Sequence, residues 1–155
     1  MFIFLSLTLL MFVGVLLRYF VLAGVAYWTC WIFKCEALQT RRIDGGMTES
    51  RQLPKFRAQM QSEIFYSILA CAIFALAGSG IYIAWKLGWT KVYLDISQYG
   101  WGYFFLSFWI AAFFHETYFY WTHRWMHGVR VFRKVHKVHH DSKSPTPWAA
   151  FSFHP

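Results

Sequence analysis

The chain has 155 residues, of which 57% are hydrophobic and 23% aromatic, while only 14% are charged. A soluble domain of this length has too small an interior to hide so many apolar side chains, so the composition excludes an ordinary soluble fold and indicates a protein of the lipid bilayer. A net charge of +8 would suggest nucleic acid binding in a soluble protein, but here the basic residues flank apolar segments, which favours contact with lipid headgroups and argues against a nucleic acid partner.

The first predicted membrane segment covers residues 2–33, which are apolar apart from Arg18. As one helix this segment would be about 48 Å long, which exceeds a hydrocarbon core of about 30 Å. Arg18 therefore either extends its charged end toward an interface or pairs with a partner inside the membrane. The segment lacks a basic start and a small-residue cleavage site, so we expect it to be a retained membrane helix and not a signal peptide.

Two further apolar stretches follow. Residues 64–85 are uncharged and would form about 33 Å of helix, which is a suitable transmembrane length. Residues 99–114 begin a third stretch, which continues without a turn signal into the sequence HETYFYWTHRWMH. We therefore expect the third helix to extend beyond the membrane.

Basic residues alternate along the chain and predict how it is oriented. The loop at residues 34–63 and the region after Trp121 are rich in them, whereas residues 86–98 are poor. In order along the chain, these residues are Lys34, Arg41, Arg42, Arg51, Lys55 and Arg57; then Lys86 and Lys91; then Arg124, Arg130, Arg133, Lys134, Lys137 and Lys143. Because cytoplasmic loops carry the excess of Lys and Arg, we expect the first loop and the carboxyl-terminal region on the cytoplasmic side.

These features predict an all-α integral membrane protein that crosses the bilayer several times. We expect about three transmembrane helices and a cytoplasmic, histidine-rich helical cap. Residues 1–114 would form the membrane helices with the basic cytoplasmic loop (34–63), and residues 115–155 would form the cap.

The cap contains all seven histidines of the chain, at positions 115, 123, 127, 136, 139, 140 and 154. None of the three cysteines lies among them, which excludes Cys/His zinc-finger sites. His123 and His127 are four residues apart, so on a helix they project from one face, one turn apart, and can reach one metal ion. Such a pair alone is weak support, because it also occurs by accident in helix interiors and at interfaces.

A second group contains His136, His139 and His140. If residues 128–140 form a regular helix, these three histidines share one arc beside Phe132. Val131, Val135 and Val138 fall on a second arc, and Arg130, Arg133, Lys134 and Lys137 on a third. The alternative for this segment is a basic helix that only binds lipid headgroups.

Glu116 lies on the same predicted helical stripe as His123 and His127. Its carboxylate could bind a metal or accept a hydrogen bond from an imidazole, and pairing with Arg124 or another base is the competing interpretation. His115 lies to one side of this stripe, so we expect it to contribute less. Imidazole ligands suit several first-row transition metals, and therefore ligand type alone does not name the metal.

The sequence HETYFYWTHRWMH and the later sequence FRKVHKVHHDSKSPTPWAAFSFHP resemble the catalytic core of the fatty acid hydroxylase/sterol desaturase superfamily. The resemblance rests on the YWTHRWMH block, the HKVHH block, the Ser-x-x-Pro-x-Pro segment and the closing Phe-His-Pro. It covers about 40 residues directly, and the upstream segments agree only in hydropathy. Glu116 stands where this family usually has Asp.

The resemblance implies a membrane-bound, non-haem diiron oxygenase that hydroxylates or desaturates a sterol, fatty acyl or related lipid. His123, His127, His136, His139 and His140 would bind two iron ions, with Glu116, His115 and His154 as possible additional or supporting residues. Dioxygen and an external cytochrome-type or ferredoxin-type electron donor would be required. The family continues toward a third histidine cluster, which residues 115–155 do not contain, so we expect this stretch to be the beginning of the catalytic region and its site to be incomplete.

Two other functions remain open at this point. One is an inactive fragment or a metal-binding membrane protein without oxygenase activity. The other is a bis-histidine haem electron carrier, which would need histidines facing each other from separate membrane helices, whereas this sequence has none before position 115.

Overall fold

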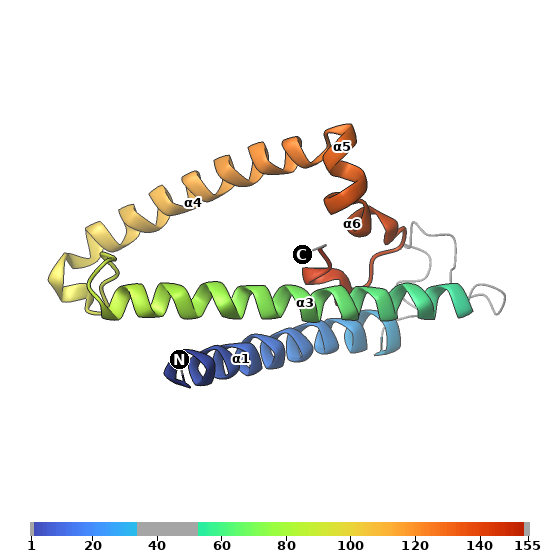
Figure 1. Ribbon diagram of the computed structural model, residues 1–155, viewed down its shortest axis with the longest axis horizontal. Coiled ribbons are helices and arrows are strands. Elements are labelled where there is room, and N and C mark those ends of the chain that lie inside the picture. Colours follow the sequence, from blue (N-terminus) through green and yellow to red (C-terminus); the bar gives the residue numbers. More distant parts are fainter. Residues whose placement is uncertain (1, 34–52, 154–155) are drawn as a thin grey trace.

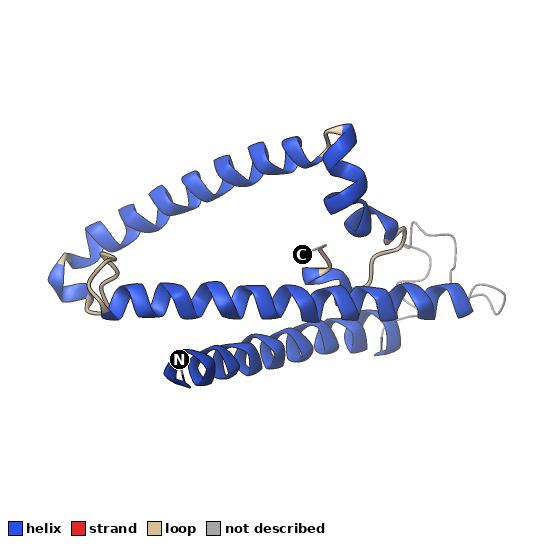
Figure 2. Cartoon of the chain, in the orientation of Figure 1, coloured by secondary structure: helices blue, strands red, loops and turns tan. Residues whose placement is uncertain are grey.

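The computed structural model describes residues 2–33 and 53–153. Within these ranges the chain is helical with short connecting loops and contains no strand (Figure 2), which confirms the predicted all-α class. The long helices are α1 (Phe2–Tyr27), α3 (Leu53–Lys86) and α4 (Gly100–Met126). The short elements are η1 (Trp28–Phe33), η2 (Ile96–Gln98), α5 (Val129–Val131), η3 (Phe132–His136), α6 (Lys137–Asp141) and η4 (Pro147–Phe151).

Helices α1 and α3 lie side by side (Figure 1). Their contact contains a small buried core of Tyr19, Ala23 and Cys71. Phe12, Val15, Leu16, Trp148 and Phe151 pack against this core. Small residues at the contact let the two helix axes approach closely, which is how membrane helices commonly associate.

Two helical segments are long and apolar enough to cross a membrane: residues 2–33, with 32 residues, and α3, with 34. Large apolar side chains such as Leu9, Leu22 and Phe65 are exposed on their outer surfaces. Such a surface would cause aggregation in a soluble monomer, whereas lipid covers it in a bilayer. These segments account for two of the three predicted spans, and the count of three stays a prediction.

Helix α4 runs from the far end of α3 and diverges from it (Figure 1). The connection contains Gly88 at φ +75, and α4 begins with Gly100 at φ +78, two left-handed conformations that glycine adopts at low cost. The helix then continues without interruption to Met126, which confirms that the third apolar stretch extends into the histidine-containing sequence. Most side chains of α4, Trp109 and Phe113 among them, are exposed.

The predicted regular helix over residues 128–140 is wrong in detail. Gly128 ends α4 with an extended backbone, and α5 then leads into the π-helical turn η3, which is followed by α6. A π turn places more residues in each turn than an α-helix does, so the faces drawn at 100° per residue shift across it. Of the three valines assigned to one arc, Val135 is 36% exposed, whereas Val131 and Val138 are half-buried.

The last described segment returns to the membrane helices (Figure 1). Its short helix η4 packs against both α1 and α3. The ring of Phe151 lies 5.9 Å from the ring of Tyr19 and 5.5 Å from that of Phe74. This segment therefore connects the histidine-containing elements to the α1/α3 pair.

Candidate metal centre

Four histidines from the end of α4 and from the η3/α6 segment form one cluster. In His123, His127, His136 and His140, one ring nitrogen from each residue lies within 4.8 Å of the corresponding nitrogens of the others. We call these residues the four-histidine cluster. Two pieces of chain separated by the bend at Gly128 are thus brought together at one point.

The last turn of α4 supplies the first pair of the cluster. His123 and His127 are one turn apart, and their Nε2 atoms are 3.1 Å apart. The ring of Phe119, one turn earlier, stacks on His123 with a centroid distance of 5.6 Å. The i, i+4 spacing that predicted a shared face is realised because α4 is regular as far as Met126.

The π turn supplies His136, which is the most enclosed member of the cluster. It is 1% exposed, and neither of its ring nitrogens has a hydrogen-bond partner within the described part of the chain. Its ring centroid lies 4.6 Å from those of His123 and His140 and 4.8 Å from that of His127. Buried polar atoms are almost always paired, so an unpaired imidazole at the centre of three others fits a metal-binding position.

The surroundings of His136 keep its imidazole neutral. Burial, followed by the neighbouring imidazoles of His123, His140, His127 and His139, lowers the pKa of His136 to about 4. A neutral imidazole has a free lone pair on one nitrogen, which is the form that binds a metal. His136 is therefore in the metal-binding form at physiological pH.

His139 is placed differently from the other four predicted ligands. It does not belong to the four-histidine cluster, and its ring stacks on Phe153 at 4.7 Å with an interplanar angle of 15°. Its centroid is 5.5 Å from that of His136. The structure thus brings together four of the five predicted ligands and leaves the fifth beside them.

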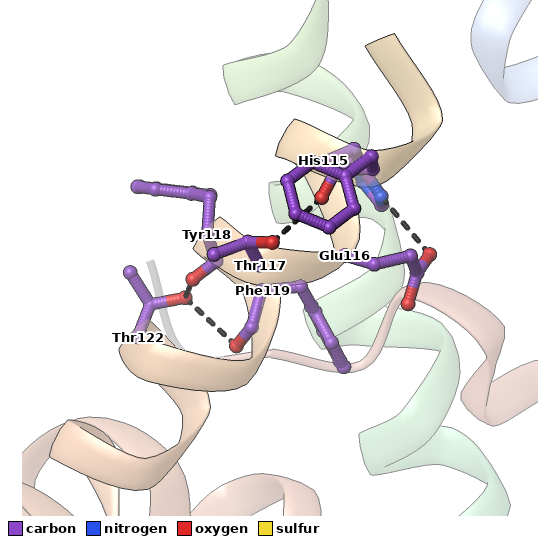
Figure 3. Close-up of polar contacts among 7 residues, drawn as sticks. His115, Glu116, Thr117, Tyr118, Phe119 and Thr122 are labelled. Carbon is purple, nitrogen blue, oxygen red and sulfur yellow. Dashed lines mark hydrogen bonds and ion pairs between the residues drawn. The ribbon is translucent and has the colours of Figure 1, made fainter. Parts of the chain in front are cut away.

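Of the three predicted additional residues, two are described, and both lie outside the cluster. Glu116 and His115 are exposed, and Glu116 Oε1 pairs with His115 Nδ1 at 3.2 Å (Figure 3). The ring of His115 stacks on Phe119 at 6.4 Å, and Phe119 in turn stacks on His123. His154 lies outside the described residues.

The donor set fits a transition-metal ion. Imidazole nitrogens lie about 2.0–2.1 Å from a bound zinc ion, so two nitrogens on one ion are roughly 3–4 Å apart. The 4.8 Å limit within the cluster is close to this spacing, and coordination would satisfy the orphaned His136. Four imidazole donors suffice for one ion, and their chemistry suits iron as well as zinc or copper.

The sequence-based prediction missed the residues that hold this region against the membrane helices. Glu63 and Thr146 share a buried hydrogen bond across 83 positions of sequence, and Tyr19 and Ser67 both donate to the carbonyl of Trp148. One signal was available, namely the spacing of Gln59, Glu63 and Ser67 on one face of α3 at its polar end.

Comparison with known families places the cluster in a recognised sequence context. Residues 108–155, which contain all four clustered histidines, match the sequence profile of the family described as Fatty acid hydroxylase. No solved structure matches the chain.

Curated relatives match a larger part of the chain. A Delta(7)-sterol 5(6)-desaturase, ERG3B of Gibberella zeae, is 35% identical over 103 residues, which are 66% of this chain and 32% of the relative. Lathosterol oxidase of Mus musculus is 31% identical over 105 residues, 66% of this chain and 35% of the relative. A second desaturase of Gibberella zeae, ERG3A, is 29% identical over 153 residues, 97% of this chain and 40% of the relative.

The chain thus spans about a third of the length of the curated relatives it matches. The family profile covers the histidine-containing end, and the desaturases extend the similarity into the membrane helices. Together with the four-histidine cluster, these matches show that the chain belongs to the fatty acid hydroxylase/sterol desaturase superfamily.

Proposed function

We propose that the protein containing this chain is a membrane-bound, non-haem diiron oxygenase that oxidises a lipid C–H bond, with a sterol as its substrate. The observation that carries the proposal is the four-histidine cluster around the orphaned His136, at the end of a helix whose apolar side chains are exposed. A sterol is favoured over a fatty acyl chain because the relatives named above are sterol desaturases and a lathosterol oxidase. For the same reason we propose desaturation as the outcome.

The residues of the chain would contribute in three ways. His123, His127, His136 and His140 would hold iron through their ring nitrogens, with His139 as a further ligand after a turn of its ring away from Phe153. The enclosure of His136 would keep water from the metal. The exposed apolar side chains of α4 would let a lipid approach the cluster from the bilayer.

Iron, when bound, would supply the activation of dioxygen and the removal of hydrogen from an unactivated carbon, chemistry that no amino-acid side chain provides. A two-iron centre needs roughly eight to ten donors, so groups beyond the cluster, His139 first among them, would complete it. Electrons would come from a cytochrome-type or ferredoxin-type donor. The exposed Arg130, Arg133 and Lys134 beside the cluster favour an acidic docking partner.

The proposed orientation puts residues 34–63 and the cluster in the cytoplasm, in a chain that crosses the membrane more than once. The basic residues of these two regions support it. A single reporter cysteine at position 45, in a background without the native cysteines, should react with an impermeant reagent only after the membrane is opened. Modification from the outside of intact cells would contradict the orientation.

The function is tested on the full-length protein in lipid nanodiscs. We expect about two irons per protein, no haem Soret band, and oxidation of a Δ7-sterol when a reductase and donor are added, with no oxidation of a fatty acyl substrate. His123→Ala should abolish oxidation, whereas His115→Ala, which removes an exposed histidine of the same helix outside the cluster, should retain it.

The same measurements identify the alternatives. Iron binding without oxidation of any lipid would favour a metal-binding membrane protein, and a Soret band would favour a haem carrier. Oxidation of a fatty acyl chain but not of the sterol would support the proposed oxygenase activity and contradict the proposed sterol substrate.

A further inference from the structure

The segment that follows the last clustered histidine is held by a polar stripe of α3. Gln59, Glu63 and Ser67 are spaced four residues apart and therefore share one face of the helix. All three make hydrogen bonds to residues 144–148, which lie more than 80 positions later in the sequence. We call residues 144–148 the anchor segment.

Glu63 is the central residue of this stripe. It is 1% exposed, and its two carboxylate oxygens accept hydrogen bonds from Gln59 Nε2 at 2.8 Å and from Thr146 Oγ1 at 2.5 Å. Burying a carboxylate is costly even when it is hydrogen-bonded, and a hydrophobic side chain would stabilise a helix contact at least as well. Glu63 is therefore better explained by the specific position it imposes on Thr146 than by general stability.

Thr146 transmits that position to the anchor segment. Its hydroxyl donates to Glu63 and accepts the backbone N–H of Trp148 at 3.2 Å, so it caps the short helix η4. Pro145 and Pro147 on either side have no backbone N–H and so cannot donate a backbone hydrogen bond to Glu63, whereas the Thr146 hydroxyl does. The same Gln59 that supports Glu63 also donates to the carbonyl of Ser144 at 2.9 Å.

Trp148 secures the other end of the segment. Its carbonyl accepts hydrogen bonds from Tyr19 at 2.7 Å and Ser67 at 2.9 Å. Its ring packs against those of Tyr19 and Phe20, at 6.0 and 5.9 Å. The anchor segment is thus bound to both membrane helices.

The anchor segment is the route by which the cluster is tied to those helices. Among the described elements, η4 packs extensively on α1 and α3, whereas η3 packs on its neighbours α5 and α6 and on α4. The segment begins four residues after His140, and beyond it Phe153 stacks on His139. Loss of the hydrogen bond between Thr146 and Glu63 would therefore weaken the attachment of the histidine-containing turn to α3, while the contacts of Trp148 remain.

We propose that Glu63 is a positioning residue of the metal centre, which acts through Thr146 to hold the anchor segment and so fixes the second histidine group against the first. This inference rests on the metal-binding part of the proposed function. Glu63 itself touches neither the metal ligands nor a substrate in this account.

The experiment compares Thr146→Val, which removes the hydroxyl and keeps the shape, with Thr146→Ser, which keeps the hydroxyl. Ser79→Ala is the matched control, because it removes a buried hydroxyl from α3 that bonds only to its own helix, at Ala75. Hydrogen exchange of residues 136–152 is measured on the metal-free full-length protein, and Co²⁺ affinity is measured by its visible absorption on protein shown to be folded.

We expect Thr146→Val to speed exchange in residues 136–152 while leaving α1 unchanged, and to weaken Co²⁺ binding about tenfold, an effect of the size seen when groups supporting a metal ligand are removed. Thr146→Ser should keep the wild-type exchange rate and the wild-type Co²⁺ affinity, and Ser79→Ala should change neither. Glu63→Leu, which removes the acceptor, should have at least the effect of Thr146→Val, and adding Thr146→Val to it should change little more, because the link is already broken.

Unchanged exchange in Thr146→Val overturns the inference whatever happens to the metal. Faster exchange with unchanged Co²⁺ affinity also overturns it, since Thr146 would then stabilise the fold without positioning the site. If the wild-type protein does not bind Co²⁺, both the proposed function and the positioning role are overturned. The Co²⁺ titration of the wild type alone identifies this outcome.

Discussion

The α1/α3 pair and the histidine-containing end of the molecule are held together in different ways. The pair and η4 are joined by part-buried hydrogen bonds between residues 81 and 129 positions apart, such as that from Tyr19 to Trp148. The four-histidine cluster is assembled from residues within 17 positions of one another, across a single bend. One region is a long-range scaffold, and the other is a local site with unpaired polar atoms at its centre. Stability and metal binding should therefore respond to different substitutions.

The largest separation of the two properties is expected at His136. Replacing it by leucine (His136→Leu) removes the central donor of the cluster, so we expect Co²⁺ affinity to fall by at least about 100-fold. The metal-free protein should stay folded, because the substitution removes two orphaned polar atoms from a buried position. Isothermal titration with Co²⁺ and circular dichroism measure the two effects. Unchanged Co²⁺ affinity would contradict the assignment of the four-histidine cluster as the metal-binding region.

The opposite result is expected in the scaffold. Trp148→Ala removes a half-buried ring that packs on Tyr19, Phe20 and Tyr27, and we expect it to lower the free energy of unfolding by about 3 kcal/mol. Denaturation in mixed micelles with sodium dodecyl sulfate gives this value. Leu17→Ala is the control, because Leu17 is exposed on α1, the helix against which Trp148 packs. It should change the free energy of unfolding little. Equal losses at the two positions would mean that the anchor carries no special share of the stability.

A smaller effect is expected from pH. The pKa of His136 is lowered to about 4 in the folded chain from an ordinary value of 6.5, so the unfolded chain takes up a proton in this interval that the folded chain does not. The contribution to stability is therefore complete above pH 6.5 and is lost as the pH falls toward 4. We expect the metal-free wild type to lose more stability than His136→Leu between pH 7 and pH 5. Parallel pH profiles for the two proteins would contradict the burial of a neutral imidazole.

The smallest effect is expected at Gly24, where helix α1 meets the ring of Trp148. A Cβ atom there would lie 3.5 Å from Trp148 Cη2, an ordinary van der Waals distance. Gly24→Ala should therefore change the free energy of unfolding by no more than about 0.5 kcal/mol, and the helix propensity of alanine offsets part of any strain. Gly24→Leu should displace the ring and resemble Trp148→Ala. A large loss for the alanine variant would show that the contact is tighter than described.

The contrast between the regions also explains how much could be predicted from the sequence. The helical class, the continuous α4 and the sharing of one site by His123 and His127 followed from local periodicity, because their spacing in sequence sets their spacing on a helix. The π turn at residues 132–136 could not be predicted this way, since it departs from the regular period, and it helps to place His139 beside Phe153. The bond between Glu63 and Thr146 spans 83 positions, and no periodic signal connects residues so far apart.

The central claim is that the clustered histidines form a metal centre, and X-ray absorption at the iron edge tests it most directly. The iron-loaded, full-length protein should show the multiple-scattering pattern of several imidazole ligands, and this pattern should weaken in His136→Leu but stay intact in His115→Ala. Iron surrounded only by oxygen ligands, or a spectrum that is the same in all three proteins, would contradict the account.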